Sequence, residues 1–147
     1  MQWLLYLLAL AAGVALPVQS GLNAQVSRVL GQPVFSALWS FGVGAAALML
    51  YSAVRRLPLR DLGQVAQLPA WGWLPGVLGA FYVTATVVLV PRLGAVLTFA
   101  LIIGGQMLIS LLLDHFGLLG LAVKPLSAGR LAGAALLVVG VLLIRRF

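Results

Sequence analysis

This chain of 147 residues contains few charged residues and no cysteine. Charged residues make up 7% of the sequence, whereas a typical water-soluble domain has roughly 25%. A chain with so few charges cannot cover a surface that faces water, so most of its surroundings must be lipid. The lack of cysteine excludes disulfides and thiolate metal sites, and the other residues offer too few ligands for a metal centre.

Acidic residues are much scarcer than basic ones, since Asp61 and Asp114 are the only two, and His115 is the only histidine. No Ser–His–acid set is evident, and no glycine pattern of a nucleotide-binding loop occurs. We therefore expect neither an enzyme nor a protein with a cofactor. The net charge of +7 does not indicate nucleic-acid binding. The basic residues flank apolar runs, where they anchor helix ends and meet anionic lipid headgroups.

What the chain does contain is a series of long uncharged apolar segments. A helix needs about 20 apolar residues to cross a hydrocarbon core of ~30 Å. The segments also lack the period-two alternation of transmembrane barrel strands. The sequence therefore predicts an all-α integral membrane protein, a single transmembrane domain over residues 1–147. Its five helices are expected over about residues 3–29, 34–54, 71–90, 94–115 and 126–145.

The basic residues are divided almost equally between the two ends of these spans. The N-terminal side holds five, and the other side holds Arg28, Arg92, Arg145 and Arg146. Orientation follows an excess of Lys and Arg on the cytoplasmic side, and five against four is almost no excess. Either a partner or one decisive charge selects a single topology, or copies insert both ways and pair antiparallel. We favour the second, which gives a ten-helix dimer with the inverted symmetry of many secondary transporters.

Polar side chains within the spans are the candidate site residues, because an uncompensated polar group in hydrocarbon is costly. In the first helix Pro17 removes a backbone donor and predicts a kink. Gln19 and Asn23 share a face at i and i+4, and they either bind a polar solute or bond to a neighbouring helix. With polar residues of the third and fourth helices, the predicted substrate-binding set is Gln19, Asn23, Tyr82, Gln106 and Ser110.

Two ionisable residues, Asp114 and His115, fall in the last turn of the predicted fourth helix. Adjacent positions on a helix do not face each other. The two residues either have hydrogen-bond or charge partners at the helix end or gain and lose protons during transport, and the sequence leaves both interpretations open.

Two rows of small residues favour helix packing. One row lies on the second helix and comprises Ser36, Ser40 and Gly44, which we interpret as packing rather than binding. The other lies on the fifth helix and predicts a dimer interface at Gly129, Gly133 and Gly140.

Several short motifs occur in order along the chain. They are Pro17-x-Gln19-x-x-x-Asn23-Ala24, Ser40-Phe41-x-x-Gly44, Gly76-x-x-Gly79-Ala80-x-Tyr82-Val83, Pro91-Arg92-Leu93-Gly94, Gly105-Gln106 and Ser110-x-x-x-Asp114-His115-Phe116-Gly117. Together they resemble the YdcZ-like family, a five-helix group of uncharacterised function in the drug/metabolite transporter superfamily, over about residues 13–141. The resemblance implies a multi-pass protein of the bacterial inner membrane. It also implies a family of single genes, gene pairs and fused ten-helix forms.

Combined with the nearly equal division of basic residues between the two sides, this resemblance implies that the chain is half of a transporter. We expect an antiparallel homodimer, or a pair with a paralogous five-helix partner, that moves an unknown small polar or amphipathic molecule by alternating access. Similar small multidrug exporters couple protons through a buried Glu in their first helix. Gln19 and Asn23 are the polar residues of that helix here, which does not favour proton-coupled export of cations. The alternatives are a passive pore or lipid scramblase, and a structural or assembly subunit that does not transport.

Overall fold

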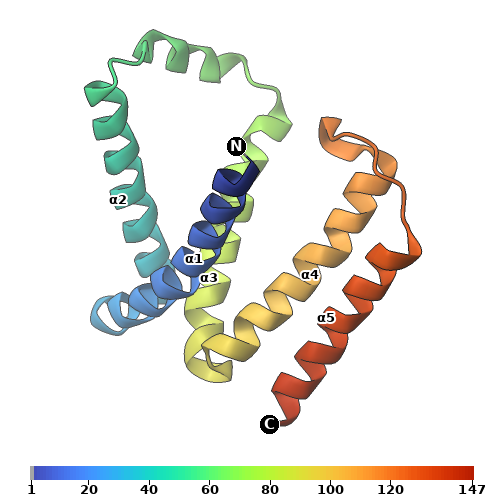
Figure 1. The fold of residues 1–147 in the computed structure, drawn as a ribbon. Helices are drawn as coiled ribbons and strands as arrows, with labels where there is room; N and C mark the ends of the chain where they lie inside the picture. The colour runs from blue at the N-terminus through green and yellow to red at the C-terminus, as the bar shows by residue number, and fades with distance from the viewer. Residues whose placement is uncertain (1) are drawn as a thin grey trace. The chain divides into compact units, whose positions relative to one another are not determined.

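The computed structural model describes residues 2–147, which contain long helices and no strand (Figure 1). The long helices are α1 (Gln2–Leu30), α2 (Pro33–Val54), α3 (Leu74–Leu93), α4 (Ala95–Phe116) and α5 (Ala128–Arg146). Short 3₁₀ segments lie in the connections, namely η1 (Leu59–Gln67), η2 (Ala70–Trp73) and η3 (Leu118–Gly120). Five helices are long and apolar enough to cross a membrane, with η2 continuing into α3. The prediction of an all-helical chain with five spans is confirmed.

Two of the helix boundaries that differ from the prediction have clear local reasons. The sequence predicts that the third helix ends at residue 90, whereas α3 continues to Leu93 with Pro91 inside it. A proline ring holds φ near the helical value, so the last turn tolerates the loss of one donor. The chain reverses at Gly94, whose φ of 79° suits glycine. The fifth helix begins at Ala128 because Ser127 is its N-cap and accepts a hydrogen bond from the backbone N–H of Arg130.

The chain divides into two compact units, the first ending at Arg92 and the second comprising Leu93–Phe147. In the first unit α1 packs on α2 close to the turn that joins them, and the two helices separate toward their other ends (Figure 1). The buried residues of this pair lie near that turn and are small or polar. Small side chains let two backbones approach closely in lipid, where polar side chains can bond across the interface. These residues are Ser20, Asn23 and Ala24 of α1 and Ser36 and Ala37 of α2.

In the second unit α4 and α5 lie side by side (Figure 1). α4 ends at Gly117, which has a left-handed φ of 60°. A Cβ atom at this position would lie 2.7 Å from Val123 Cγ2, so both the backbone angle and the space require glycine. The connection then passes over the end of α4, since the Lys124 N–H donates to the Asp114 carbonyl oxygen at 2.8 Å. This path sets the position at which α5 begins.

Candidate functional site

The polar side chains of α1 and α2 meet between the two helices. Gln19 Nε2 and Asn23 Nδ2 donate to the same acceptor, Ser40 Oγ, at 3.4 and 3.3 Å. The Ser36 hydroxyl donates to the backbone carbonyl oxygen of Asn23 at 2.6 Å. Ser36 and Asn23 are buried, whereas Gln19 is exposed on the surface of the unit. We refer to Gln19, Asn23, Ser36 and Ser40 as the amide–serine cluster.

A hollow of about 340 Å³ adjoins this cluster. Gln19 and Ser40 form its polar edge, and all of its lining residues are uncharged. The remaining walls are Phe41, Gly44, Ala45, Leu48 and Val83. The volume is at the lower end of the range of about 300–1,000 Å³ that small-molecule sites occupy. The hollow therefore suits a small ligand with one hydrogen-bonding end and an apolar body.

The cluster has hydrogen-bonding capacity that such a ligand can use. Ser40 Oγ accepts two hydrogen bonds, which occupy both of its lone pairs and leave its own hydrogen to donate. Each amide nitrogen carries two hydrogens, and the contact with Ser40 uses one of them in Gln19 and one in Asn23. The cluster can therefore offer donors as well as carbonyl acceptors to a neutral polar group such as an amide or a hydroxyl.

Tyr82 of α3 carries another polar group within the first unit. Its hydroxyl is buried and has no hydrogen-bond partner among the residues that the structure describes. Such a group costs free energy in an apolar interior unless a further partner reaches it. The α3 residue that lines the hollow is Val83, the next in sequence, and Tyr82 is not among the lining residues. Thr86 differs from Tyr82, because its hydroxyl donates to the Val83 carbonyl oxygen at 2.8 Å.

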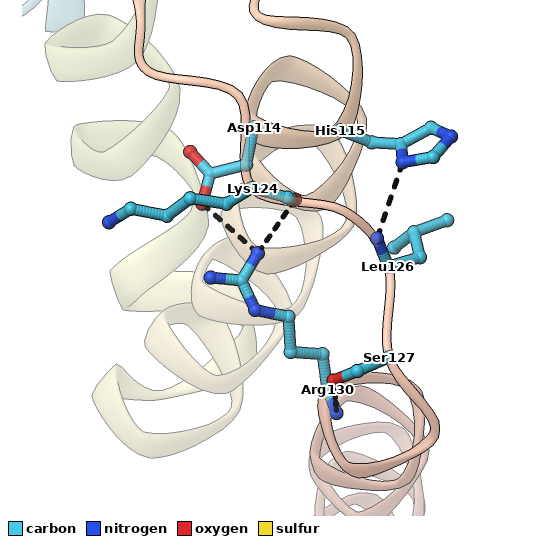
Figure 2. Close-up of polar contacts among 6 residues, drawn as sticks. All are labelled: Asp114, His115, Lys124, Leu126, Ser127 and Arg130. Carbon is cyan, nitrogen blue, oxygen red and sulfur yellow. Dashed lines mark hydrogen bonds and ion pairs between the residues drawn. The ribbon is translucent and has the colours of Figure 1, made fainter.

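A second polar arrangement joins the end of α4 to the start of α5 (Figure 2). Arg130 Nη1 lies 3.4 Å from Asp114 Oδ2 and 3.1 Å from the carbonyl oxygen of Lys124. His115 Nδ1 accepts a hydrogen bond from the Leu126 N–H at 3.2 Å. Asp114 and His115 point in different directions in Figure 2, where Asp114 contacts Arg130 of α5 and His115 contacts Leu126 of the connection. Both residues thus have structural partners at the helix end.

A hollow of about 290 Å³ lies beside this ion pair in the second unit. Ser110, Asp114 and Arg130 supply its polar lining, with Gly133 and Ala134 of α5 on the facing helix. Gln106, one turn before Ser110, is exposed and is not among the lining residues. The structure thus brings Gln19 and Asn23 together in one unit and groups Ser110 with Asp114 in the other. The single five-residue binding set stays a prediction.

Sequence reasoning misses two residues of these arrangements. Ser40 is assigned to a packing row, although it accepts the hydrogen bonds of both amides. Arg130 is one of the basic residues that the sequence indicates only as flanking the apolar runs, although it pairs with Asp114, 16 residues earlier. The i+4 spacing of Ser36, Ser40 and Gly44 is a sequence signal that could have indicated the role of Ser40. The pairing of Arg130 depends on the path of the connection between α4 and α5, which no local sequence pattern predicts.

Comparison with known proteins points to the bacterial inner membrane. Residues 4–143 match the model of a family described as "Putative inner membrane exporter, YdcZ". The inner membrane protein YdcZ of Escherichia coli (strain K12) is 30% identical over 140 residues, which are 93% of this chain and 91% of the relative. No solved structure matches the chain.

Proposed function

Because this chain belongs to the YdcZ family, which its motifs predict and residues 4–143 match, we propose that it is half of an inner-membrane exporter. Its passenger is a small, uncharged, polar or amphipathic molecule. The observation that carries this proposal is the amide–serine cluster beside a hollow of about 340 Å³ with uncharged walls. Polar groups gathered within membrane-spanning helices, next to space for a ligand, are typical of a solute path.

The walls of the hollow favour a neutral passenger over a charged one. Burying an ionised group without a counter-charge is far more costly than burying a hydroxyl or amide that finds hydrogen bonds. The residues lining the hollow offer hydrogen bonds at Gln19 and Ser40 but no ionised side chain. The Asp114–Arg130 pair belongs to the other unit, where the two side chains lie 3.4 Å apart and offset each other's charge.

We propose further that two copies assemble antiparallel into a ten-helix transporter. The nearly equal division of basic residues between the two sides supports insertion in both orientations. The predicted seam of α5 also has room for a partner helix. A Cβ atom at Gly129, Gly133 or Gly140 would meet nothing within 4 Å in the described structure. A paralogous five-helix chain could occupy the same seam, and the labelling experiment below distinguishes the two assemblies.

The way in which α1 and α2 meet supports alternating access. Their buried contacts are confined to the end near the connecting turn, and the helices diverge beyond it (Figure 1). Rocking of α2 about this contact would change the width of the hollow while keeping the buried pair Ser36 and Asn23 together. Pro17 lies in α1 just before the cluster, where a proline loosens the helix backbone. The hollow would then open only away from the connecting turn, which is one side of the membrane in one copy and the other side in its antiparallel partner.

Flux into proteoliposomes tests the transport role. The purified chain is reconstituted, incubated with a mixture of neutral and charged amphipathic metabolites, and the vesicle contents are measured by mass spectrometry. We expect protein-dependent accumulation of uncharged compounds that saturates with concentration. Flux that never saturates would indicate a pore or scramblase, and the absence of protein-dependent flux would leave a structural subunit as the better reading.

Phe147→Cys tests the antiparallel homodimer. The chain has no cysteine and Phe147 is 99% exposed, so this variant carries a single accessible thiol. With both orientations present, a membrane-impermeant maleimide should label about half of the thiols in sealed right-side-out vesicles, because almost no charge bias selects one direction. Labelling after detergent treatment gives the total. Trp3→Cys, at the other end of the chain, is the matched control and should give the complementary fraction. Complete or absent labelling in sealed vesicles would contradict the homodimer and favour a paralogous partner.

A further inference from the structure

A third hollow, of about 340 Å³, lies where α1 and α3 end in the first unit. Arg28 and Arg92 both border it, one from each helix, and Ser27 adds a hydroxyl. Val87 and Val88 of α3 supply apolar lining. The transport site proposed above uses none of these residues. Two guanidinium groups, a hydroxyl and an apolar wall therefore meet at one end of the membrane span.

No acidic side chain is among the residues that line this hollow. The two acidic residues are Asp61, in the connection after α2, and Asp114, at the end of α4. Asp114 is moreover paired with Arg130, at 3.4 Å. The positive charge at this hollow is therefore not balanced by its own lining, and it can attract an anion from outside the chain.

Helix ends reduce this positive charge without removing it. α1 and α3 both end here, and a helix C-terminus carries about −0.5 of an elementary charge. Two such ends offset about half of the charge of two arginines. α2 begins at Pro33, which also lines the hollow, and the side chain of its N-cap residue Gln32 does not cap the helix. The positive end of α2 therefore adds to the attraction for an anion.

We propose that this hollow binds the phosphate group of an anionic phospholipid. Arg28, Arg92 and Ser27 donate hydrogen bonds to the phosphate oxygens, and Val87 and Val88 contact the start of an acyl chain. The ends of spans lie at the depth of lipid headgroups, and basic pockets between transmembrane helices suit anionic headgroups. The apolar wall favours a lipid over free phosphate, because inorganic phosphate has no apolar part that could contact it. The bound lipid would link the ends of α1 and α3.

Native mass spectrometry with added phosphatidylglycerol or phosphatidylcholine tests this site on the purified full-length chain. The wild-type protein should retain phosphatidylglycerol in preference to phosphatidylcholine. Arg28→Gln and Arg92→Gln should each weaken phosphatidylglycerol binding about fivefold, and together about 25-fold, from the usual contribution of one basic residue near an anionic surface. The matched control is the double variant Arg145→Gln/Arg146→Gln. It removes two arginines outside the hollow and should bind like the wild type.

Competition separates the two sources of a phosphate group. Millimolar inorganic phosphate should leave phosphatidylglycerol bound, and displacement that depends on Arg28 and Arg92 would show that the site serves a soluble phosphate instead. Undiminished phosphatidylglycerol binding by the double glutamine variant would overturn the site altogether. Arg28→Lys/Arg92→Lys keeps both charges and is the control for loss of binding through misfolding. This variant should retain most of the phosphatidylglycerol binding. A loss of binding equal to that of the double glutamine variant would also overturn the proposal.

Discussion

Replacing Gln19 by Leu is expected to abolish the stabilisation of this protein by neutral amphipathic ligands while leaving its fold intact. Gln19 is exposed in the first unit, and its bond to Ser40 is 3.4 Å long. Loss of that bond should cost only about 0.6 kcal/mol, the average for polar contacts between membrane helices. A ligand in the adjacent hollow would instead lose a polar partner and meet an apolar side chain. We expect at least about tenfold weaker binding.

Thermal unfolding with three short probes measures this effect. Hexanamide, hexanoate and hexylammonium share one alkyl chain and differ in charge, and a ligand that binds the folded state raises Tm with its concentration. Hexanamide should raise the Tm of the wild-type protein the most, and it should have little effect on the Tm of Gln19→Leu.

Gln25→Leu is the matched control for this experiment. It makes the same side-chain change in the same helix, at an exposed position outside the amide–serine cluster. It should respond to hexanamide like the wild type. Equal responses of Gln19→Leu and Gln25→Leu would contradict the site. A stronger wild-type response to either charged probe would show that the passenger is not neutral.

Replacing Ser36 by Leu is expected to destabilise the first unit more than any change at an exposed position of α2. Ser36 is 0% exposed at the contact between α1 and α2, and its hydroxyl lies 2.6 Å from the Asn23 carbonyl oxygen. A leucine side chain has no room between helices that approach this closely. Overpacking typically costs about 1–3 kcal/mol, to which the lost hydrogen bond adds about 0.6 kcal/mol.

The free energy of unfolding in mixed detergent micelles measures this cost. Ser36→Ala separates the two contributions, because it removes the hydroxyl without adding volume and should cost only the hydrogen bond. Ser52→Leu is the control for adding a leucine to α2. The Ser52 hydroxyl bonds within its own helix, to the Leu48 carbonyl oxygen at 2.8 Å. If Ser36→Leu proves as stable as Ser52→Leu, the tight contact between α1 and α2 is not present in the folded protein.

The polar residues show where prediction from sequence ends. Gln19 and Asn23 stand out because amides are costly in hydrocarbon, and their i+4 spacing places them on one face. The sequence leaves open whether they bind a solute or bond to a neighbouring helix. The structure shows the bonds to Ser40, and the adjoining hollow leaves room for a ligand as well. Which serine of α2 accepts the bonds depends on the register of two helices that cross.

The ion pair of the second unit likewise depends on how separate segments of the chain meet in the fold. Asp114 and Arg130 are recognisable separately, as a carboxylate at a helix end and a basic residue in the first turn of a span. They meet because the connection turns at Gly117, and the Lys124 N–H bonds to the Asp114 carbonyl oxygen at 2.8 Å. The sequence around Asp114 or Arg130 does not indicate the path that this connection takes. The pairing is a property of the connection as a whole.

Sequence alone therefore determined the number, length and approximate ends of the membrane spans, and the closeness of α2 (Pro33–Val54) to its predicted range illustrates this. The free energy of placing a helix in lipid is a sum over that helix's own residues, so a local pattern contains it. Tertiary structure decided which polar groups meet, where the hollows lie, and that Arg28 and Arg92 border one of them. Those features depend on the crossing and register of different helices, which no single segment specifies.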